Sequence, residues 1–182
     1  MDLSRPALSL ITEQNDWHCT DPAVQAASML SVRLATLADL DELVRQRLGF
    51  SLEIEPMGDP SSVASLEAAI RDWIATRLSN GSYRGYLGFL DGQVVATAAM
   101  LVYELPPLGS NVCRRQGHVL NAWTQLAYRR RGYGRQVLEF MIKDAQFAGI
   151  WRLFLNATPM GEPLYRALGF HEQDERALVK RL

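Results

Sequence analysis

The sequence predicts one α/β domain with a mixed, mostly antiparallel central sheet flanked by helices. Two observations support this fold class. Segments with the period of a strand are interleaved with segments that have the period of a helix, in the order β, α, α, β, β, β, α, β, α, β. The chain has 182 residues, of which 48% are hydrophobic, and this suits one domain with a substantial core. We expect the domain at residues 31–182. Residues 1–30 show no sustained period and are expected to form an N-terminal extension, either a disordered tail or an arm packed on a neighbour.

The first expected strand, at residues 31–34, is followed by a helix. Thr36 is suited to cap that helix, and Asp39 three residues later makes an acidic variant of the capping box. Apolar residues then repeat at helical spacing until Gly49, which is expected to end the helix. Residues 49–60 contain Gly, Pro and acidic side chains and are expected to form a loop.

A second helix and a hairpin are expected next. Asp59 at the cap and Pro60 at the first helical position predict the start of the helix, and Asn80-Gly81 predicts its end. Strands at 83–90 and 93–103 flank Asp91-Gly92, a two-residue hairpin turn signal. The remaining expected elements are a loop at 105–115, a strand at 117–125, a helix to about residue 148, a strand at 151–155, a short helix at 163–168 closed by Gly169, and a final strand at 170–182.

A basic loop, Arg129–Arg135, lies between the strand at 117–125 and the helix that follows. The first N–H groups of a helix lack internal partners, and the helix dipole favours negative charge there. Glycine lets an anion approach the backbone, and the four arginines of the loop add donors suited to phosphate. The chain has no Gly-Lys pair, which excludes a P-loop, and Val137 stands where a Rossmann fingerprint needs its third glycine. The loop is therefore expected to bind a different phosphate-bearing cofactor.

The loop fits the pattern R-x-x-G-x-G at Arg129, Gly132 and Gly134, and Leu164–Phe170 downstream reads LYRALGF. Together, the two motifs resemble the GNAT superfamily of acetyl-coenzyme A-dependent N-acetyltransferases. The resemblance implies a GNAT-type domain at 31–182 with acetyl-CoA as co-substrate. It implies pantetheine pairing with the strand backbone and pyrophosphate binding by the loop. The expected cofactor-binding residues are Ala122, Trp123, Thr124, Arg129, Arg130, Arg131, Gly132, Tyr133, Gly134, Arg135 and Thr158.

The resemblance also assigns a general acid. Tyr165 occupies the position of the LYxxLGF tyrosine, which lies near the cofactor sulfur in the superfamily. A phenol with a reference pKa of about 10 stays protonated at neutral pH and can donate to a thiolate. The alternative is a tyrosine that only packs its ring beside Leu164 and Phe170.

The sequence has no direct counterpart of the general base found in many relatives. Many relatives place a glutamate on the strand before the pyrophosphate loop, but no acid stands between His118 and Tyr128. Glu104, at the end of the preceding strand, is the acidic candidate, and its alternative is an ordinary surface carboxylate. His118 has a suitable reference pKa but is expected to lie far from the sulfur.

The acceptor is expected to be a primary amine of a small molecule or peptide. Asn121 is expected to orient the amine or a water, and Glu53 belongs to an acidic loop that would suit a cationic amine. The function predicted is thus acetyl transfer from acetyl-CoA to an amine. The alternative is a non-catalytic acyl-CoA sensor that kept the cleft and lost its base.

Composition excludes other classes. A formal net charge of −1 gives no support for nucleic-acid binding, and no apolar run of about eighteen residues exists to cross a membrane. Cys19 and Cys113 lie far apart and the three histidines are scattered, so no metal is expected. A reduced, cytoplasmic protein is expected, and the sequence is compatible with a homodimer.

Overall fold

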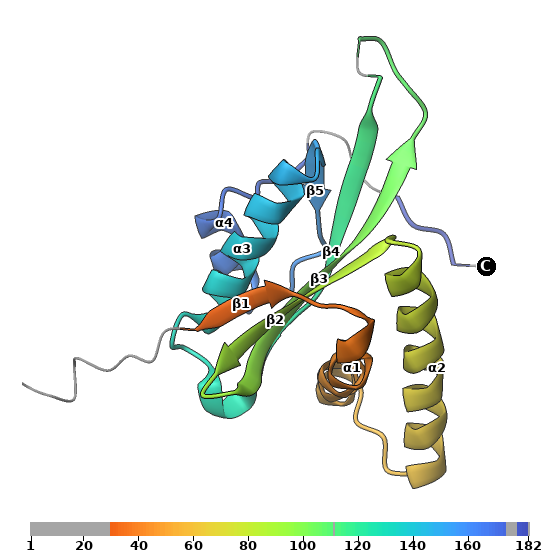
Figure 1. The fold of residues 1–182 in the computed structure, drawn as a ribbon, viewed down its shortest axis with the longest axis vertical. Coiled ribbons are helices and arrows are strands. Elements are labelled where there is room, and N and C mark those ends of the chain that lie inside the picture. The colour runs from red at the N-terminus through yellow and green to blue at the C-terminus, as the bar shows by residue number, and fades with distance from the viewer. Residues whose placement is uncertain (1–29, 111, 174–177, 182) are drawn as a thin grey trace, which may run out of the picture.

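The computed structural model describes residues 30–110, 112–173 and 178–181, so the expected extension lies outside the described residues except for Leu30. Its centre is one five-stranded sheet in the order β1-β2-β3-β4-β5 (Figure 1). The strands are β1 Ser31–Leu34, β2 Tyr83–Leu90, β3 Gln93–Leu105, β4 Arg114–Thr124 and β5 Arg152–Phe154. Neighbouring strands are antiparallel except for β4 and β5, which are parallel. This confirms the predicted mixed, mostly antiparallel sheet.

Helices cover both faces of the sheet (Figure 1). On one face lie α1 Leu40–Ile54, which follows a short 3-10 turn at Leu37–Asp39, and α2 Pro60–Ser79. On the other lie α3 Tyr133–Phe147 and α4 Glu162–Ala167. Each face has its own apolar core. Residues of α1 and α2 pack against Tyr83, Leu87 and Ala99, whereas α3 packs against Tyr86 and Met100.

Most of the predicted boundary signals act as expected. The side chain of Asp59 accepts a hydrogen bond from the Ser62 N–H at 2.9 Å, which caps α2. The Thr36 N–H donates to Asp39 Oδ2 at 2.8 Å, at the turn that leads into α1. Asp91 and Gly92 both adopt positive φ and connect β2 to β3.

Two predictions about element ends are wrong. The helix α1 does not end at Gly49 but continues to Ile54. Position 49 requires a glycine for a different reason: a Cβ there would lie 2.9 Å from the Trp123 ring. The final strand is also absent from the described part of residues 170–182, namely 170–173 and 178–181. Leu178 and Val179 are 93% and 88% exposed, so these apolar side chains bury nothing that would hold a sixth strand on the sheet.

Candidate active site

The strands β4 and β5 separate after a short pairing. They pair only at Gln116–His118 with Arg152–Phe154. Beyond this point the register between β3 and β4 shifts, and Asn121 adopts a positive φ of 55°. From Val119 to Thr124, β4 therefore has no strand partner on the β5 side among the described residues. The backbone of Ala122–Thr124 presents an open edge that an amide-containing chain can pair with.

The open edge leads to the start of α3. Gly132 precedes the helix with a φ of 82°, and a Cβ on Gly134 would lie 3.0 Å from Thr124 Oγ1. The two glycines of the motif thus have different tasks, one in the turn and one in close packing. Within the described chain, no acceptor bonds the N–H groups of Gly132–Arg135. These N–H groups and the dipole of a 15-residue helix form an anion site.

The arginines of the loop divide into two groups. Arg129 is a positioning residue: its Nε donates to Thr124 O at 2.8 Å, and its guanidinium pairs with Glu53. Arg135 pairs with Glu139 one turn along α3. Arg130 and Arg131 are exposed and have no carboxylate within ion-pair distance in the described parts of the chain. They are the two cations of the loop most readily available to a phosphate.

A cleft of about 520 Å³ runs along the open edge and the loop. It is lined by most of the residues predicted from sequence: Glu53, Asn121, Ala122, Trp123, Thr124, Arg129, Arg130, Gly132, Tyr133, Gly134, Arg135, Thr158 and Tyr165. Thr158 faces the cleft just before α4, and its Oγ1 accepts a hydrogen bond from the Gly161 N–H at 3.2 Å. Two predicted residues, Arg131 and Glu104, are not among the lining residues.

Tyr165 packs in the core of the C-terminal segment and also reaches the cleft. Its ring packs edge-on against Phe170, with 5.8 Å between centroids, and it also lines the cleft. Burial raises the pKa of its phenol above the usual value. The hydroxyl is therefore protonated at neutral pH and can donate a hydrogen bond.

The two predicted acidic residues have different surroundings. Glu104 has a side chain that is 72% exposed, and its carboxylate lies 3.5 Å from Arg115 Nε. Glu53 lines the cleft, but its carboxylate already accepts hydrogen bonds from Arg129 and from Trp123 Nε1, the latter at 2.8 Å. These donors lower the pKa of Glu53, with the Arg129 hydrogen bond the larger cause. Glu53 thereby ties α1 to the loop and to the open edge.

Asn121 and His118 place two further polar groups in the cleft. Asn121 is 4% exposed, and its buried Oδ1 has no hydrogen-bond partner in the part of the chain that the structure describes. An unsatisfied buried acceptor costs roughly 1–3 kcal/mol, which a bound donor would recover. His118 stacks on Phe154 at 4.3 Å, and burial lowers its pKa. His118 lines the cleft at the point where the pairing of β4 with β5 ends.

In this α/β architecture an open strand edge leads to a helix start whose first N–H groups have no acceptor among the described residues. The chain belongs to the acetyltransferase (GNAT) family, whose sequence model matches residues 47–170. No curated protein matches the chain.

Solved structures share the fold. A GCN5-related N-acetyltransferase from Ralstonia eutropha JMP134 is 28% identical, with a TM-score of 0.67 over 84% of this chain and 99% of that chain. A predicted acetyltransferase from Clostridium acetobutylicum, solved with acetyl-CoA, is 24% identical, with a TM-score of 0.70 over 84% of this chain and 96% of that chain. Glucosamine-6-phosphate N-acetyltransferase from Arabidopsis thaliana is 14% identical, with a TM-score of 0.62 over 84% and 98% of the two chains. None of the described helices is both long and apolar enough to cross a membrane.

Proposed function

We propose that the protein transfers the acetyl group of acetyl-CoA to the primary amine of a small molecule, by direct attack within a ternary complex. The observation that supports this most is the open edge of Ala122–Thr124, which leads straight into the free N–H groups of Gly132–Arg135. The edge would pair with pantetheine amides, and the start of α3 would bind the pyrophosphate. The thioester would then lie further along the edge, near Asn121.

The chemistry requires two proton transfers. The amine nitrogen attacks the thioester carbonyl carbon, a C–N bond forms, and the C–S bond breaks with its electron pair going to sulfur. Tyr165 would donate a hydrogen bond or proton to the departing thiolate. Tyr165 would then recover its proton from water or from the base.

The proton of the attacking amine needs an acceptor. Among the described cleft residues, the groups that can accept one at neutral pH are the Glu53 carboxylate and the His118 imidazole. Glu53 is already paired with Arg129, whereas burial lowers the pKa of His118 and keeps its ring neutral. We therefore propose that His118 takes the proton, directly or through water, in place of the Glu104 that the sequence suggested. Asn121 would orient the amine through its unpaired Oδ1.

Free-thiol release tests this proposal. The protein is incubated with acetyl-CoA and a panel of amino acids, simple amines, polyamines and aminoglycosides, and products are confirmed by mass. The expected result is stoichiometric thiol and acetylated amine with at least one acceptor. Tight acetyl-CoA binding without turnover on the whole panel would favour a non-catalytic acyl-CoA sensor instead.

A further inference from the structure

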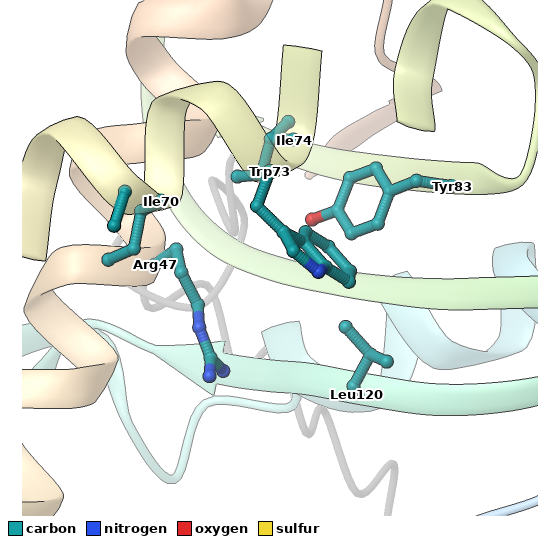
Figure 2. Close-up of a pocket in the computed structure, with 7 residues that line it drawn as sticks. Arg47, Ile70, Trp73, Ile74, Tyr83 and Leu120 are labelled. Carbon is teal, nitrogen blue, oxygen red and sulfur yellow. The ribbon is translucent and has the colours of Figure 1, made fainter. Parts of the chain in front are cut away.

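A second cavity, of about 330 Å³, adjoins the cofactor cleft and is lined by residues of α1, α2, β2 and β4 (Figure 2). Its walls are mainly apolar, and it is lined by Arg47, Ala69, Ile70, Trp73, Ile74, Tyr83 and Leu120. Two of these residues, Arg47 and Leu120, also line the cofactor cleft. The cavity, called here the α2 pocket, therefore opens toward the place where an amine would attack the thioester.

The walls of the α2 pocket are built from packed apolar and aromatic side chains. Ile70 and Ile74 are buried in the core between α2 and the sheet. Trp73 stands edge-on to Tyr83, with 5.6 Å between ring centroids and an interplanar angle of 85°. The Arg77 guanidinium lies 4.3 Å from the Trp73 ring and covers its outer side. Binding of a ligand's apolar side chain of moderate size against these walls would remove its surface from water, which is favourable.

Two polar groups in this pocket have no hydrogen-bond or ion-pair partner among the described residues. Arg47 reaches from α1 toward β4, and the Tyr83 hydroxyl points back toward the side chains of α2 (Figure 2). Arg47 forms no ion pair or hydrogen bond in the described chain. Its guanidinium lies over the Phe50 ring, 5.0 Å from the ring centroid. Tyr83 is 2% exposed, and its hydroxyl likewise has no hydrogen-bond partner among the described residues.

The electrostatics of the two groups favour an anion. Burial lowers the pKa of the Arg47 guanidinium, yet an arginine stays charged at neutral pH, so a half-buried cation has no counter-ion in the part of the chain that the structure describes. Burial raises the pKa of Tyr83, and its phenol therefore remains a hydrogen-bond donor beside that positive charge. One cation and one neutral donor match a single negative charge. A carboxylate fits this better than a doubly charged phosphate does.

We propose that the α2 pocket is the acceptor site and that it takes an α-amino acid with an apolar side chain. This rests on the proposed function, since it names the acceptor of the same reaction. The carboxylate would bind Arg47 and Tyr83, the side chain would lie against Ile70, Trp73 and Ile74, and the α-amine would face the thioester in the cofactor cleft. Arg47 lines both cavities, so a carboxylate bound to it would lie close to the cofactor cleft. The reacting amine of the acceptor must therefore be close to its carboxylate, as the two groups are on the α-carbon of an amino acid. Peptides, polyamines and aminoglycosides lack a free carboxylate beside the reacting amine.

Turnover tests the proposal with matched acceptors. L-Phenylalanine, L-leucine and L-methionine are compared with phenylalaninamide and phenethylamine, which keep the amine but lack the carboxylate. We expect the amino acids to have kcat/KM values about tenfold to a hundredfold higher, as for loss of a hydrogen bond to a charged group. Equal or better turnover of the neutral amines would overturn the α2 pocket proposal while leaving acetyl transfer intact.

Arg47→Gln supplies the second arm. It should lower kcat/KM for phenylalanine by about tenfold or more and leave phenethylamine nearly unchanged, a change of selectivity that general misfolding would not produce. Tyr83→Phe should act in the same direction with a smaller effect. Arg45→Gln, which removes an exposed arginine of α1 paired with Glu42, is the matched control and should change neither substrate. A uniform loss with both acceptors in Arg47→Gln would contradict the proposal.

Binding separates this proposal from the proposed function. Calorimetry measures phenylalanine binding to the protein saturated with coenzyme A, which cannot react. Arg47-dependent binding without any turnover would support the α2 pocket and refute acetyl transfer. Absence of binding to wild-type protein, whether or not other amines are acetylated, would refute the α2 pocket.

Discussion

The two candidate sites adjoin at β4, and they offer a ligand different kinds of chemical group. On the α3 face, the open edge of Ala122–Thr124 and the N–H groups of Gly132–Arg135 are backbone groups, held by a short glycine motif. On the α2 face, the α2 pocket is lined by side chains from four separate elements, α1, α2, β2 and β4, with Arg47 and Tyr83 as its polar groups. If both proposals hold, the cofactor is recognised by backbone geometry and the acceptor by particular side chains. The following substitutions test that contrast.

The largest effect is expected from His118→Gln. If His118 takes the proton of the amine, its loss should lower turnover by about a hundredfold, the lower end for general base catalysis. Because burial lowers the pKa of His118, the limb of the wild-type pH–rate profile that reports His118 should lie below about pH 6.5, apart from the limb set by ionisation of the amine itself. The variant should lose this acid limb in a kcat/KM profile.

Glu104→Gln is the control for that assignment. Glu104 is exposed and lies outside the cleft, so its variant should keep both the rate and the pH profile. A strong loss in Glu104→Gln with a normal His118→Gln would restore the base suggested by sequence.

Tyr165→Phe should lower turnover at saturating substrate by about tenfold, with little change in acetyl-CoA affinity. The substitution removes one hydroxyl and leaves the edge-on packing against Phe170 intact. Steady-state kinetics and calorimetry measure the two quantities. Tyr103→Phe, on β3 outside the lining of the cleft, should change neither, and full activity of Tyr165→Phe would remove its role in proton donation.

Replacing both Arg130 and Arg131 by Ala should weaken acetyl-CoA binding by about tenfold at low salt and make the affinity less dependent on ionic strength. Both side chains are exposed and form no ion pair among the described residues, and Arg131 only lies over the Tyr128 ring, 5.8 Å from its centroid, so stability should change little. Calorimetry at several salt concentrations measures the effect. Arg71→Ala on α2 is the control, and an unchanged salt dependence in the double variant would exclude these arginines from phosphate binding.

Gly134→Ala should weaken acetyl-CoA binding by about fivefold, because its Cβ would lie 3.0 Å from Thr124 Oγ1 and push α3 away from the open edge. Adding Thr124→Ala removes that oxygen and should restore most of the affinity. Recovery in the double variant would show that close packing, and not the backbone conformation at residue 134, makes glycine necessary.

The same contrast explains what sequence could predict. Caps such as Asp59 and the turn at Asp91-Gly92 act through neighbouring residues, so local chemistry placed these elements correctly. The residues of the R-x-x-G-x-G loop are contiguous, and the loop was found for that reason. Arg47 and Tyr83, in contrast, are 36 positions apart and meet only because α1, α2 and β2 pack together.

Errors in the prediction have related causes. Gly49 was taken as a helix end because its contact with Trp123 involves a strand more than 70 residues away. The strand expected at 170–182 was wrong for the described part of that range, where Leu178 and Val179 are exposed and have no apolar surface to pack against.

The most direct test of backbone recognition on one face is amide hydrogen exchange with coenzyme A and with L-phenylalanine. Coenzyme A should slow exchange in segments 119–124 and 130–136 and leave α2 unchanged. Addition of phenylalanine to the coenzyme A complex should slow exchange in α1 and at the start of β2. Coenzyme A that protects neither the open edge nor the start of α3, or protects mainly α2, would contradict the account.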